Sequence, residues 1–476
     1  MASGSESPTP EKPTTTADTV EAASDAPNVC LVVLDSVRAA NCSLYGARRD
    51  TTPYLSELAT ESTVYHQARA PSNWSLPSHV SLFTGLETHV HGVTVHDRLE
   101  PGHTVFERLA TEHGYDTGLF TENGFVGAHE VGLRTAFETV RSVPSEFGDE
   151  YATTEVNPGP DGFYYADRFL EWVDGHGDGD QWAACVNLMD AHRPFEPAEP
   201  YDEWGDDDAR ELQADLGVRW EWAFHGGDTP MWALRGLESL YDGGIRQADA
   251  IVERLVEGLR ARGVLDDTLL VVCADHGDGF GEPGVLDEEP TAVSHIVPMH
   301  ESLLHVPLVV RYPEQRDREQ HAERRDVFRP AALTRFPSVA LDAASGRELP
   351  TDAFVPDGPV VASKQPVTGD LRERYVEACA EPEPFFAPSR AVYRAADDGT
   401  DTTSVQKTYH WGKQVGELQV YDAQSVSPRS TTTLDEAATH LDAAFDRFDS
   451  ADVRQPREDQ SVSVETKERL AALGYY

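Results

Sequence analysis

The chain has 476 residues, of which 83 are Asp or Glu and 39 are Lys or Arg, and its formal net charge is −44. This charge excludes a general nucleic-acid-binding protein, because no basic face could compete with such a field for phosphates. A content of 39% hydrophobic and 9% aromatic residues excludes a wholly disordered chain. The length predicts one large domain and a smaller one.

Arginine strongly outnumbers lysine among the basic residues. Only five of them are lysine. An acidic surface with little lysine stays hydrated at high salt, where the Debye length falls to about 3 Å at 1 M and self-repulsion is screened. The composition therefore predicts a protein from an extreme halophile.

The cysteines and the N-terminal segment bear on the cellular location. Five cysteines form neither a CxxC motif nor a disulfide framework, which is typical of a reducing compartment. Residues 1–26 are polar and lack the apolar core of a signal peptide, so we expect a disordered acidic tail. No apolar run approaches the about 20 residues of a membrane span. These features predict a cytoplasmic protein without a membrane span, and they leave its oligomeric state open.

Ordered structure is predicted to begin at Pro27. Four short apolar runs are typical of strands buried on both faces of a parallel sheet. These runs are Val29–Leu34, Trp182–Met189, Leu269–Ala274 and Val306–Val310. Helical patterns occur between them at Pro53–Glu61, Val105–His113 and Gly244–Gly263. The alternation predicts an α/β fold over residues 27–375, with a mostly parallel central sheet flanked by helices.

Two later segments depart from this pattern. Asp202–Thr229 is acidic and Trp-rich without clear periodicity, and we expect an insertion over one sheet edge. After about residue 375, short strand-like pieces precede a helical pattern. They are Arg390–Tyr393, Thr408–Trp411, Glu417–Tyr421 and the helix near Thr432–Phe448. Residues 376–476 are therefore predicted to form a small C-terminal α+β domain with antiparallel strands and a helix.

Two predicted strands end in acidic residues. Asp35 follows the first apolar run, and Asp275 and His276 follow the third. Because ligands bind outside the carboxyl ends of strands in open α/β sheets, these three side chains could share a divalent cation. Oxygen ligands favour Ca²⁺ or Mg²⁺, and an imidazole shifts the preference towards Mn²⁺ or Zn²⁺. Either Asp alone is more simply explained as a helix cap or turn residue.

Ser75 lies in the segment APSNWSLPSH. Pro77 suits the first turn of a helix, which places Ser75 at a helix N-terminus, where free N–H groups favour an anion. A hydroxyl there, beside a metal, could attack a phosphate or sulfate ester. For this segment alone, a serine N-cap is the simpler explanation.

Four blocks of the sequence resemble the sulfatase family of the alkaline-phosphatase superfamily, in the family's order from about residue 27 to 313. They are PNVCLVVLDSVRAANCSLYG with TTPYLSELATES, APSNWSLPSHVSLFTGLETHVHGV, YDGGIRQADAIVERLVEGLRARGVLDDTLLVVCADHGDGFGE and MHESLLHVPLVVRYP. A weaker match covers KTYHWGKQVGELQVYD and the terminal ALGY. The resemblance implies an alkaline-phosphatase-like fold and an anionic ester substrate.

The resemblance also implies roles for single residues. Asp35, Asp275 and His276 fall at metal-ligand positions for one divalent ion, with Ca²⁺ first and Mn²⁺, Mg²⁺ or Zn²⁺ as further candidates. Ser75 occupies the nucleophile position and is counted among the metal ligands. In active sulfatases this position carries a Cys or Ser that is oxidised to formylglycine.

The same resemblance implies a role for two histidines that lie outside the metal-ligand group. His192, in a D-x-H-x-P block, resembles a substrate-contacting histidine of the family. His295 falls near the basic residue that contacts the anion before the LLHVPLVV strand. For each of them the alternative is a packing or surface role.

The sequence departs from the family pattern at three points. The signature Cys/Ser-x-Pro-x-Arg, whose Arg guides the oxidation, ends here in His79. Ser36 replaces the usual second Asp of the first metal block, and the GKWH-like block is missing. His276 stands where many sulfatases have Asn and where phosphonate monoester hydrolase-like members have His. Formylglycine at Ser75 is possible on this pattern, but we expect an unmodified hydroxyl.

The leading hypothesis is a metal-dependent hydrolase of sulfate or phosphate esters in which Ser75 attacks. Arg38 and His79 are expected to steady the nucleophile or the anion, and His192 or His295 to protonate the leaving oxygen. One alternative is a phosphodiesterase, a phosphonate monoester hydrolase or an alkaline-phosphatase-like phosphoryl transferase that uses unmodified Ser75. The other is a non-catalytic relative that binds a metal or an anion.

Overall fold

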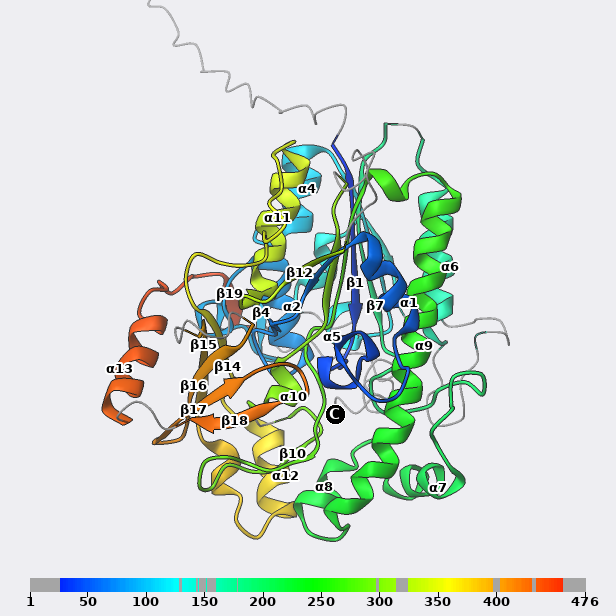
Figure 1. Ribbon diagram of the computed structural model, residues 1–476. Coiled ribbons are helices and arrows are strands. Elements are labelled where there is room, and N and C mark those ends of the chain that lie inside the picture. Colours follow the sequence, from blue (N-terminus) through cyan, green and yellow to red (C-terminus); the bar gives the residue numbers. More distant parts are fainter. Residues whose placement is uncertain are drawn as a thin grey trace, which may run out of the picture.

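The computed structural model describes residues 26–127, 131–142, 144, 151, 160–177, 179–296, 299–313, 324–396, 403–429 and 434–456. The predicted tail, apart from Ala26, and the terminal ALGY lie outside the described residues. In Figure 1 a central sheet is seen nearly edge-on with helices on both sides, and a smaller sheet lies below it to the left.

Eight strands form the central sheet, and most neighbours run parallel. In spatial order they are β12 (Arg325–Val327), β2 (Thr63–Tyr65), β11 (Leu308–Arg311), β8 (Thr268–Cys273), β1 (Asn28–Leu34), β7 (Trp182–Leu188), β5 (Asp116–Thr121) and β6 (Thr139–Arg141). The central strand β1 pairs in parallel with β7 and with β8. The mostly parallel sheet predicted from the sequence is therefore confirmed.

The strand β11 is the exception within this sheet. It pairs antiparallel with both β8 and β2. The chain between β8 and β11 includes only short elements, such as the four-residue helix α10 (Glu301–Leu304), and not a long crossover helix. A parallel pair needs such a crossover, so the chain returns in the opposite direction.

Helices cover both faces of the sheet (Figure 1). On one face α1 (Pro53–Leu58), α6 (Gly162–Val173) and α9 (Leu234–Ala261) pack together; on the other lie α2 (Ser75–Thr84), α4 (Val105–His113) and α11 (Phe336–Ala344). The predicted bounds of α4 are confirmed. Thr104 and Glu107 form a capping box at its start, and Gly114, with a φ of 73°, ends it.

The helix α9 is longer than predicted. It has 28 residues and begins at Leu234, well before the expected start at Gly244. Gly243 and Gly244 lie inside the helix because the loop after β7 packs directly against it. A Cβ atom on Gly244 would lie 2.4 Å from the carbonyl oxygen of Asp190.

The segment Asp202–Thr229, expected to be an insertion over one sheet edge, contains two helices. The helix α7 (Asp207–Leu216) packs against α9, and α8 (Glu221–His225) lies beside β10 (Ala292–Val293) and α12 (Gly369–Ala378). Asp206 caps α7 by accepting a hydrogen bond from the Ala209 N–H at 2.8 Å. The segment therefore packs on α9 and extends towards the loops that follow β8.

The smaller sheet is antiparallel and has five strands. Its order is β14 (Val360–Ser363), β15 (Ser389–Ala395), β16 (Val405–Trp411), β17 (Gln414–Val420) and β18 (Val426–Arg429). The helix α13 (Leu434–Phe445) packs on it. The predicted antiparallel strands and helix are confirmed, and β14 joins their sheet from a position before residue 376.

Short elements complete the described part of the chain. They are β3 (Ala68–Arg69), α3 (Thr88–His91), β4 (Asp97–Leu99), α5 (Gly124–Gly127), β9 (Phe280–Glu282), β13 (Ala331–Ala332) and β19 (Arg454–Pro456). Among the described residues, no helix has both the length and the apolar character that crossing a bilayer requires.

Candidate active site

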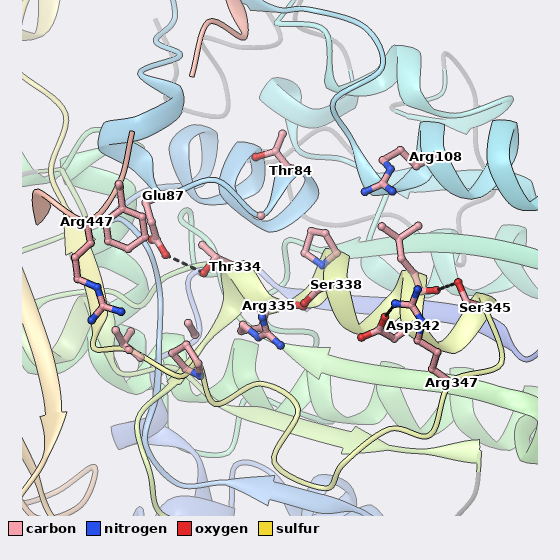
Figure 2. Close-up of a pocket in the computed structure, with 18 of the residues that line it drawn as sticks. Thr84, Glu87, Arg108, Thr334, Arg335, Ser338, Asp342, Ser345, Arg347 and Arg447 are labelled. Atoms are coloured by element: carbon pink, nitrogen blue, oxygen red, sulfur yellow. Dashed lines mark hydrogen bonds and ion pairs between the residues drawn. The ribbon is translucent and has the colours of Figure 1, made fainter. Parts of the chain in front are cut away.

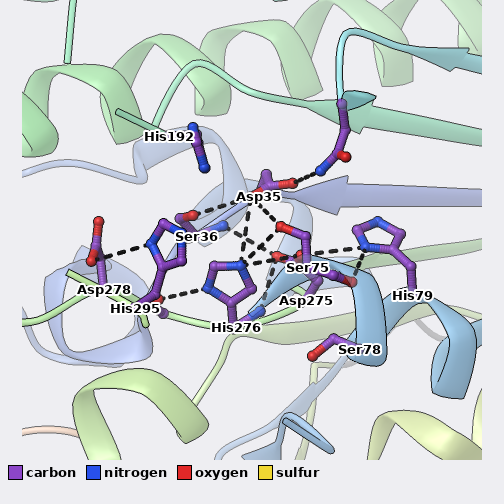
Figure 3. A network of polar contacts seen from close by, with 12 residues as sticks. Asp35, Ser36, Ser75, Ser78, His79, His192, Asp275, His276, Asp278 and His295 are labelled. Carbon is purple, nitrogen blue, oxygen red and sulfur yellow. Dashed lines mark hydrogen bonds and ion pairs between the residues drawn. The ribbon is translucent and has the colours of Figure 1, made fainter. Parts of the chain in front are cut away.

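The carboxyl ends of β1 and β8 bring three buried side chains together. Asp35 follows β1, and Asp275 and His276 follow β8, its parallel neighbour. One ligand atom from each residue lies within 4.8 Å of the others (Figure 3), and all three residues have 0% exposure. The residues that the sequence places at strand ends therefore meet at one edge of the sheet.

The donor atoms of this group fit a divalent cation. The Nδ1–H of His276 donates to the Gly277 carbonyl at 2.8 Å, which leaves the Nε2 lone pair directed at Asp275 Oδ2, 3.4 Å away. That oxygen is buried and has no hydrogen-bond partner among the described residues. A buried carboxylate oxygen without a donor, beside an imidazole lone pair, has the chemistry of a metal site.

Ser36 shapes the turn after β1. Its φ of 64° lies in the left-handed region, which non-glycine residues seldom adopt. Its N–H donates to Asp275 Oδ1 at 3.2 Å and its hydroxyl donates to Asp35 Oδ1 at 3.1 Å. Ser36 therefore links the two carboxylates as a donor, whereas an Asp at this position would add a third negative charge.

Ser75 is the first residue of α2, and its side chain points into this group (Figure 3). Its Oγ lies 3.1 Å from His276 Nε2 and 3.4 Å from Asp35 Oδ1. The N-cap position is held by Trp74, and no side-chain capping bond is formed there. Ser75 is therefore not the helix cap, which was the simpler explanation of the sequence.

His79 lies one turn further along α2. Its Nδ1–H donates to the Ser75 carbonyl at 2.9 Å and lies 3.4 Å from Asp275 Oδ2. Its Nε2 is 3.4 Å from the amide nitrogen of Asn187. Both ring nitrogens are thus engaged, and His79 braces the first turn of α2 against Asp275.

Two asparagines that the sequence analysis did not select hold Asp35. The side-chain amide of Asn123, after β5, donates to Asp35 Oδ2 at 2.7 Å, and that of Asn187, on β7, donates at 3.3 Å. Thr121 orients Asn187 by donating to its Oδ1 at 2.8 Å. A signal for them exists in the sequence, because both lie at the carboxyl ends of strands on the same side of the sheet as Asp35.

His192 and His295 border the same group. The ring centroids of His276 and His295 are 4.7 Å apart, and those of His192 and His295 are 5.2 Å apart. Burial lowers the pKa of His192 to about 3, and burial with the neighbouring His276 and Arg193 lowers the pKa of His295 well below its usual value. Burial therefore favours the neutral form of both rings.

Arg38 is directed away from Ser75, which differs from the sequence-based expectation. Its guanidinium forms ion pairs with Glu238 and Glu282, and it donates to the Asp278 carbonyl at 3.1 Å. Its side chain is 5% exposed, so the two carboxylates compensate a buried charge. In this structure Arg38 stabilises the loop after β8 and does not contact the nucleophile.

Several solved structures share this fold. The phosphonate monoester hydrolase of Agrobacterium radiobacter gives a TM-score of 0.59 at 18% identity, covering 88% of this chain and 94% of that chain. A protein solved with its substrate D-glucosamine-2-N,6-O-disulfate gives 0.60 at 14% identity, with 94% and 98% covered. An alkaline phosphatase superfamily protein from Vibrio parahaemolyticus gives 0.53 at 14% identity, with 89% and 88% covered. These similarities confirm the alkaline-phosphatase-like fold.

The sequence comparisons identify the family. No curated protein sequence matches the chain. The Sulfatase family model matches residues 27–334, which is more than half of the chain and includes Asp35, Ser75, Asp275 and His276. The chain therefore belongs to the sulfatase family and is a hydrolase of sulfate or phosphate esters.

Proposed function

We propose that this chain hydrolyses sulfate or phosphate esters with the aid of one divalent cation, and that the unmodified hydroxyl of Ser75 is the nucleophile. The observation that carries the proposal is the position of Ser75 Oγ, 3.1 Å from His276 Nε2 and 3.4 Å from Asp35 Oδ1. A hydroxyl at a helix N-terminus, beside carboxylates and an imidazole, has the surroundings of an activated nucleophile.

Asp35, Asp275, His276 and Ser75 are the side chains that would hold the cation. Ca²⁺ is our first candidate because the carboxylates suit a hard ion, and the imidazole keeps Mn²⁺, Mg²⁺ and Zn²⁺ as further candidates. When bound, the cation neutralises a nonbridging oxygen of the ester and lowers the pKa of the attacking hydroxyl. Asn123 occupies Asp35 Oδ2, so that Oδ1 remains directed at Ser75.

The remaining steps are proton transfers, and side chains of the protein itself can accept or donate these protons. Asp35 Oδ1 is within reach of the Ser75 hydroxyl proton and accepts it, because the Nε2 lone pair of His276 would be held by the cation. As Ser75 Oγ bonds to sulfur or phosphorus, the bond to the leaving oxygen breaks in line, and that oxygen takes a proton. His192 or His295 supplies it, because an anionic ester beside these buried rings raises their pKa. Water then attacks sulfur or phosphorus and gives a proton to the histidine that protonated the leaving oxygen, while Ser75 Oγ leaves with the proton held by Asp35, which releases sulfate or phosphate.

The surroundings of His79 support an unmodified Ser75. This position carries the Arg of the formylglycine signature in sulfatases. Here the ring nitrogens of His79 are engaged by the Ser75 carbonyl and by Asn187. No guanidinium is therefore supplied at this point of α2 to guide the oxidation.

A second candidate function is transfer or hydrolysis of phosphorus esters through the same hydroxyl. It is favoured by His276, which stands where phosphonate monoester hydrolase-like members carry His. The test compares para-nitrophenyl sulfate, para-nitrophenyl phosphate and a para-nitrophenyl phosphonate as substrates of the full-length protein. Turnover of the phosphorus esters at least as fast as the sulfate supports an unmodified Ser75. Metal binding without turnover of any ester would favour a non-catalytic relative.

We also propose that the protein works in the cytoplasm of a halophile. The net charge of −44 with only five lysines supports activity at high salt. Cys30, Cys42, Cys185, Cys273 and Cys379 are all free and buried, which suits a reducing compartment.

A further inference from the structure

Beside the proposed reaction site lies a cluster of buried donors that the proposed reaction does not use. Arg193, Arg219, Trp222 and Tyr375 define it, and we call it the arginine subsite. Arg193 directly follows His192, and its guanidinium donates to Ser294 Oγ at 2.9 Å. Ser294 in turn precedes His295. The subsite is therefore connected to both histidines that border Ser75.

Two arginines of the subsite share one carboxylate. Arg193 Nη1 lies 2.5 Å from Glu221 Oε2, and Arg219 Nη1 lies 3.4 Å from Glu221 Oε1. Glu221 is fully buried. Because it carries a single negative charge, it compensates only one of the two positive charges of Arg193 and Arg219. Burial and the charge of Arg193 lower the pKa of Arg219 to about 10, as expected where positive charge is in excess.

The other charges named near the subsite do not neutralise its excess of positive charge. Arg374 lies within electrostatic reach of Arg219 and adds a further positive charge. Asp278 lies within electrostatic reach of Arg193, and His295 Nδ1 lies 3.5 Å from its Oδ1. Arg193, Arg219 and Arg374 thus carry more positive charge than Glu221 and Asp278 carry negative charge.

The subsite also contains buried polar atoms without an acceptor. The Nε atoms of Arg193 and Arg219, the indole Nε1 of Trp222 and the hydroxyl of Tyr375 make no hydrogen bond to any described residue. Tyr375 is fully buried, its ring lies 4.8 Å from that of Trp222, and it is influenced by the charges of Glu221, Arg193 and Arg219. Buried donors are rarely left unpaired, so their concentration here points to an acceptor that binds.

We propose that Arg193, Arg219 and Tyr375 bind a second anionic group of the substrate, carried by the alcohol part of the ester. This inference rests on the proposed function, because it takes the ester under attack to lie at Ser75. Guanidinium groups with surplus charge and a neighbouring hydroxyl are the donors that recognise a carboxylate, sulfate or phosphate. The substrate class is therefore an ester of an alcohol that carries another negative charge. Esters of neutral alcohols leave these donors unpaired and are disfavoured.

The test uses ligands without an ester bond, so that it does not depend on turnover. Benzenesulfonate and meta-benzenedisulfonate are titrated into the full-length protein by calorimetry at a fixed KCl concentration with Ca²⁺. The wild type is expected to bind the disulfonate about tenfold more tightly. The substitution Arg219→Gln removes this preference while the Kd of benzenesulfonate changes less than about twofold. Arg210→Gln is the matched control, because Arg210 belongs to the same segment and pairs with Asp202 at the surface.

The choice of variant protects the test from a folding defect. The Arg219 side chain is 24% exposed, and its removal leaves Glu221 paired with Arg193. Arg193→Lys, which keeps the charge and loses the planar fork, is a second variant and should weaken the disulfonate more than benzenesulfonate. Equal binding of the two ligands by the wild type overturns the subsite. Equal losses for both ligands in Arg219→Gln also overturn it, because they place the arginine at the reacting group. An inactive protein would contradict the proposed function without changing this comparison.

Discussion

The two ends of helix α2 lie in polar regions that differ in how deeply their charged side chains are buried. At its N-terminus, Ser75 joins Asp35, Asp275 and His276, and none of the four is more than 2% exposed (Figure 3). At its C-terminus, Thr84 and Gly85 help to line a pocket of about 850 Å³ (Figure 2). Four arginines also line this pocket: Arg108, Arg335, Arg347 and Arg447.

Two of the pocket arginines pair with carboxylates at the surface. Arg108 lies 2.9 Å from Glu112, and Arg347 pairs with Asp342, with these side chains between 37% and 70% exposed. Exposed pairs contribute about 0–1 kcal/mol each. At the other end of α2 the carboxylates of Asp35 and Asp275 are buried. Three of their oxygens accept hydrogen bonds, and Asp275 Oδ2 has no hydrogen-bond partner among the described residues. Burial and unpaired polar atoms therefore distinguish the proposed reaction site from this pocket, whereas pocket volume does not.

The largest expected effect is a loss of kcat on removal of the Ser75 hydroxyl at the N-terminus of α2. Ser75→Ala should lower kcat by on the order of 10³-fold or more, because the variant lacks the hydroxyl proposed to attack the ester. The melting temperature should stay close to that of the wild type, since Ser75 is not the helix cap, and the metal affinity should fall only modestly because Asp35, Asp275 and His276 remain. Ester hydrolysis assays with calorimetry check both parts. Full activity in this variant would remove Ser75 from the chemistry.

Loss of one carboxylate should break the metal site. Asp275→Asn removes a charged ligand, so micromolar chelator should strip the cation from the variant but not from the wild type. Metal content after dialysis measures this. Asp342→Asn, in the pocket of Figure 2, is the matched control and should keep the metal. Equal metal retention in Asp275→Asn and the wild type would mean that Asp275 is not a ligand.

The asparagines that donate to Asp35 test whether its hydrogen bonds contribute to metal affinity. Asn187→Leu removes a donor to Asp35 Oδ2 and to His79 Nε2 with little change in volume. Groups that orient metal ligands typically contribute about 10–100-fold in affinity, and a loss of this size is expected in a calorimetric metal titration. An unchanged affinity would show that the amide serves packing alone.

High salt should stabilise the acidic surface as a whole. With a net charge of −44, raising KCl from about 0.1 M to the multimolar range screens repulsion between the carboxylates. The melting temperature should rise across this range in differential scanning calorimetry. A flat curve would contradict the halophilic character.

The smallest effect is expected in the pocket at the C-terminus of α2. Asp342→Asn breaks the exposed pair with Arg347 and should change the free energy of unfolding by less than about 1 kcal/mol. The kcat should not change. Denaturant unfolding and an ester assay measure the two quantities, and a large loss of either would place the pocket in the function.

Local sequence was sufficient to predict the central strands and to place Asp35 at the end of one of them. The runs before Asp35 and Asp275 are continuous and apolar, because β1 and β8 are buried on both faces. Polar residues at the carboxyl ends of parallel strands then indicated where ligands meet. The same rule would also have selected Asn187, which stands within the otherwise apolar run of β7.

Features that depend on distant contacts could not be predicted. Arg38 was expected near Ser75, but Glu238 and Glu282, which lie 200 and 244 residues away in sequence, fix its guanidinium elsewhere. Gly243 and Gly244 interrupt the helical pattern of α9, and their packing against Pro197 and Asp190 in the loop after β7 explains them. The direction of β11 depends on the path of the chain after β8, which the apolar run alone does not contain.

The central claim is that Ser75 acts as an unmodified hydroxyl. Mass spectrometry of the peptide that contains Ser75, from protein made in a halophilic host and quenched during turnover of para-nitrophenyl phosphate, tests it directly. We expect the mass of unmodified serine before the reaction and a phosphate adduct on Ser75 after quenching. A mass lower by two hydrogen atoms, which marks formylglycine at this position, would contradict the claim and support a formylglycine-dependent sulfatase.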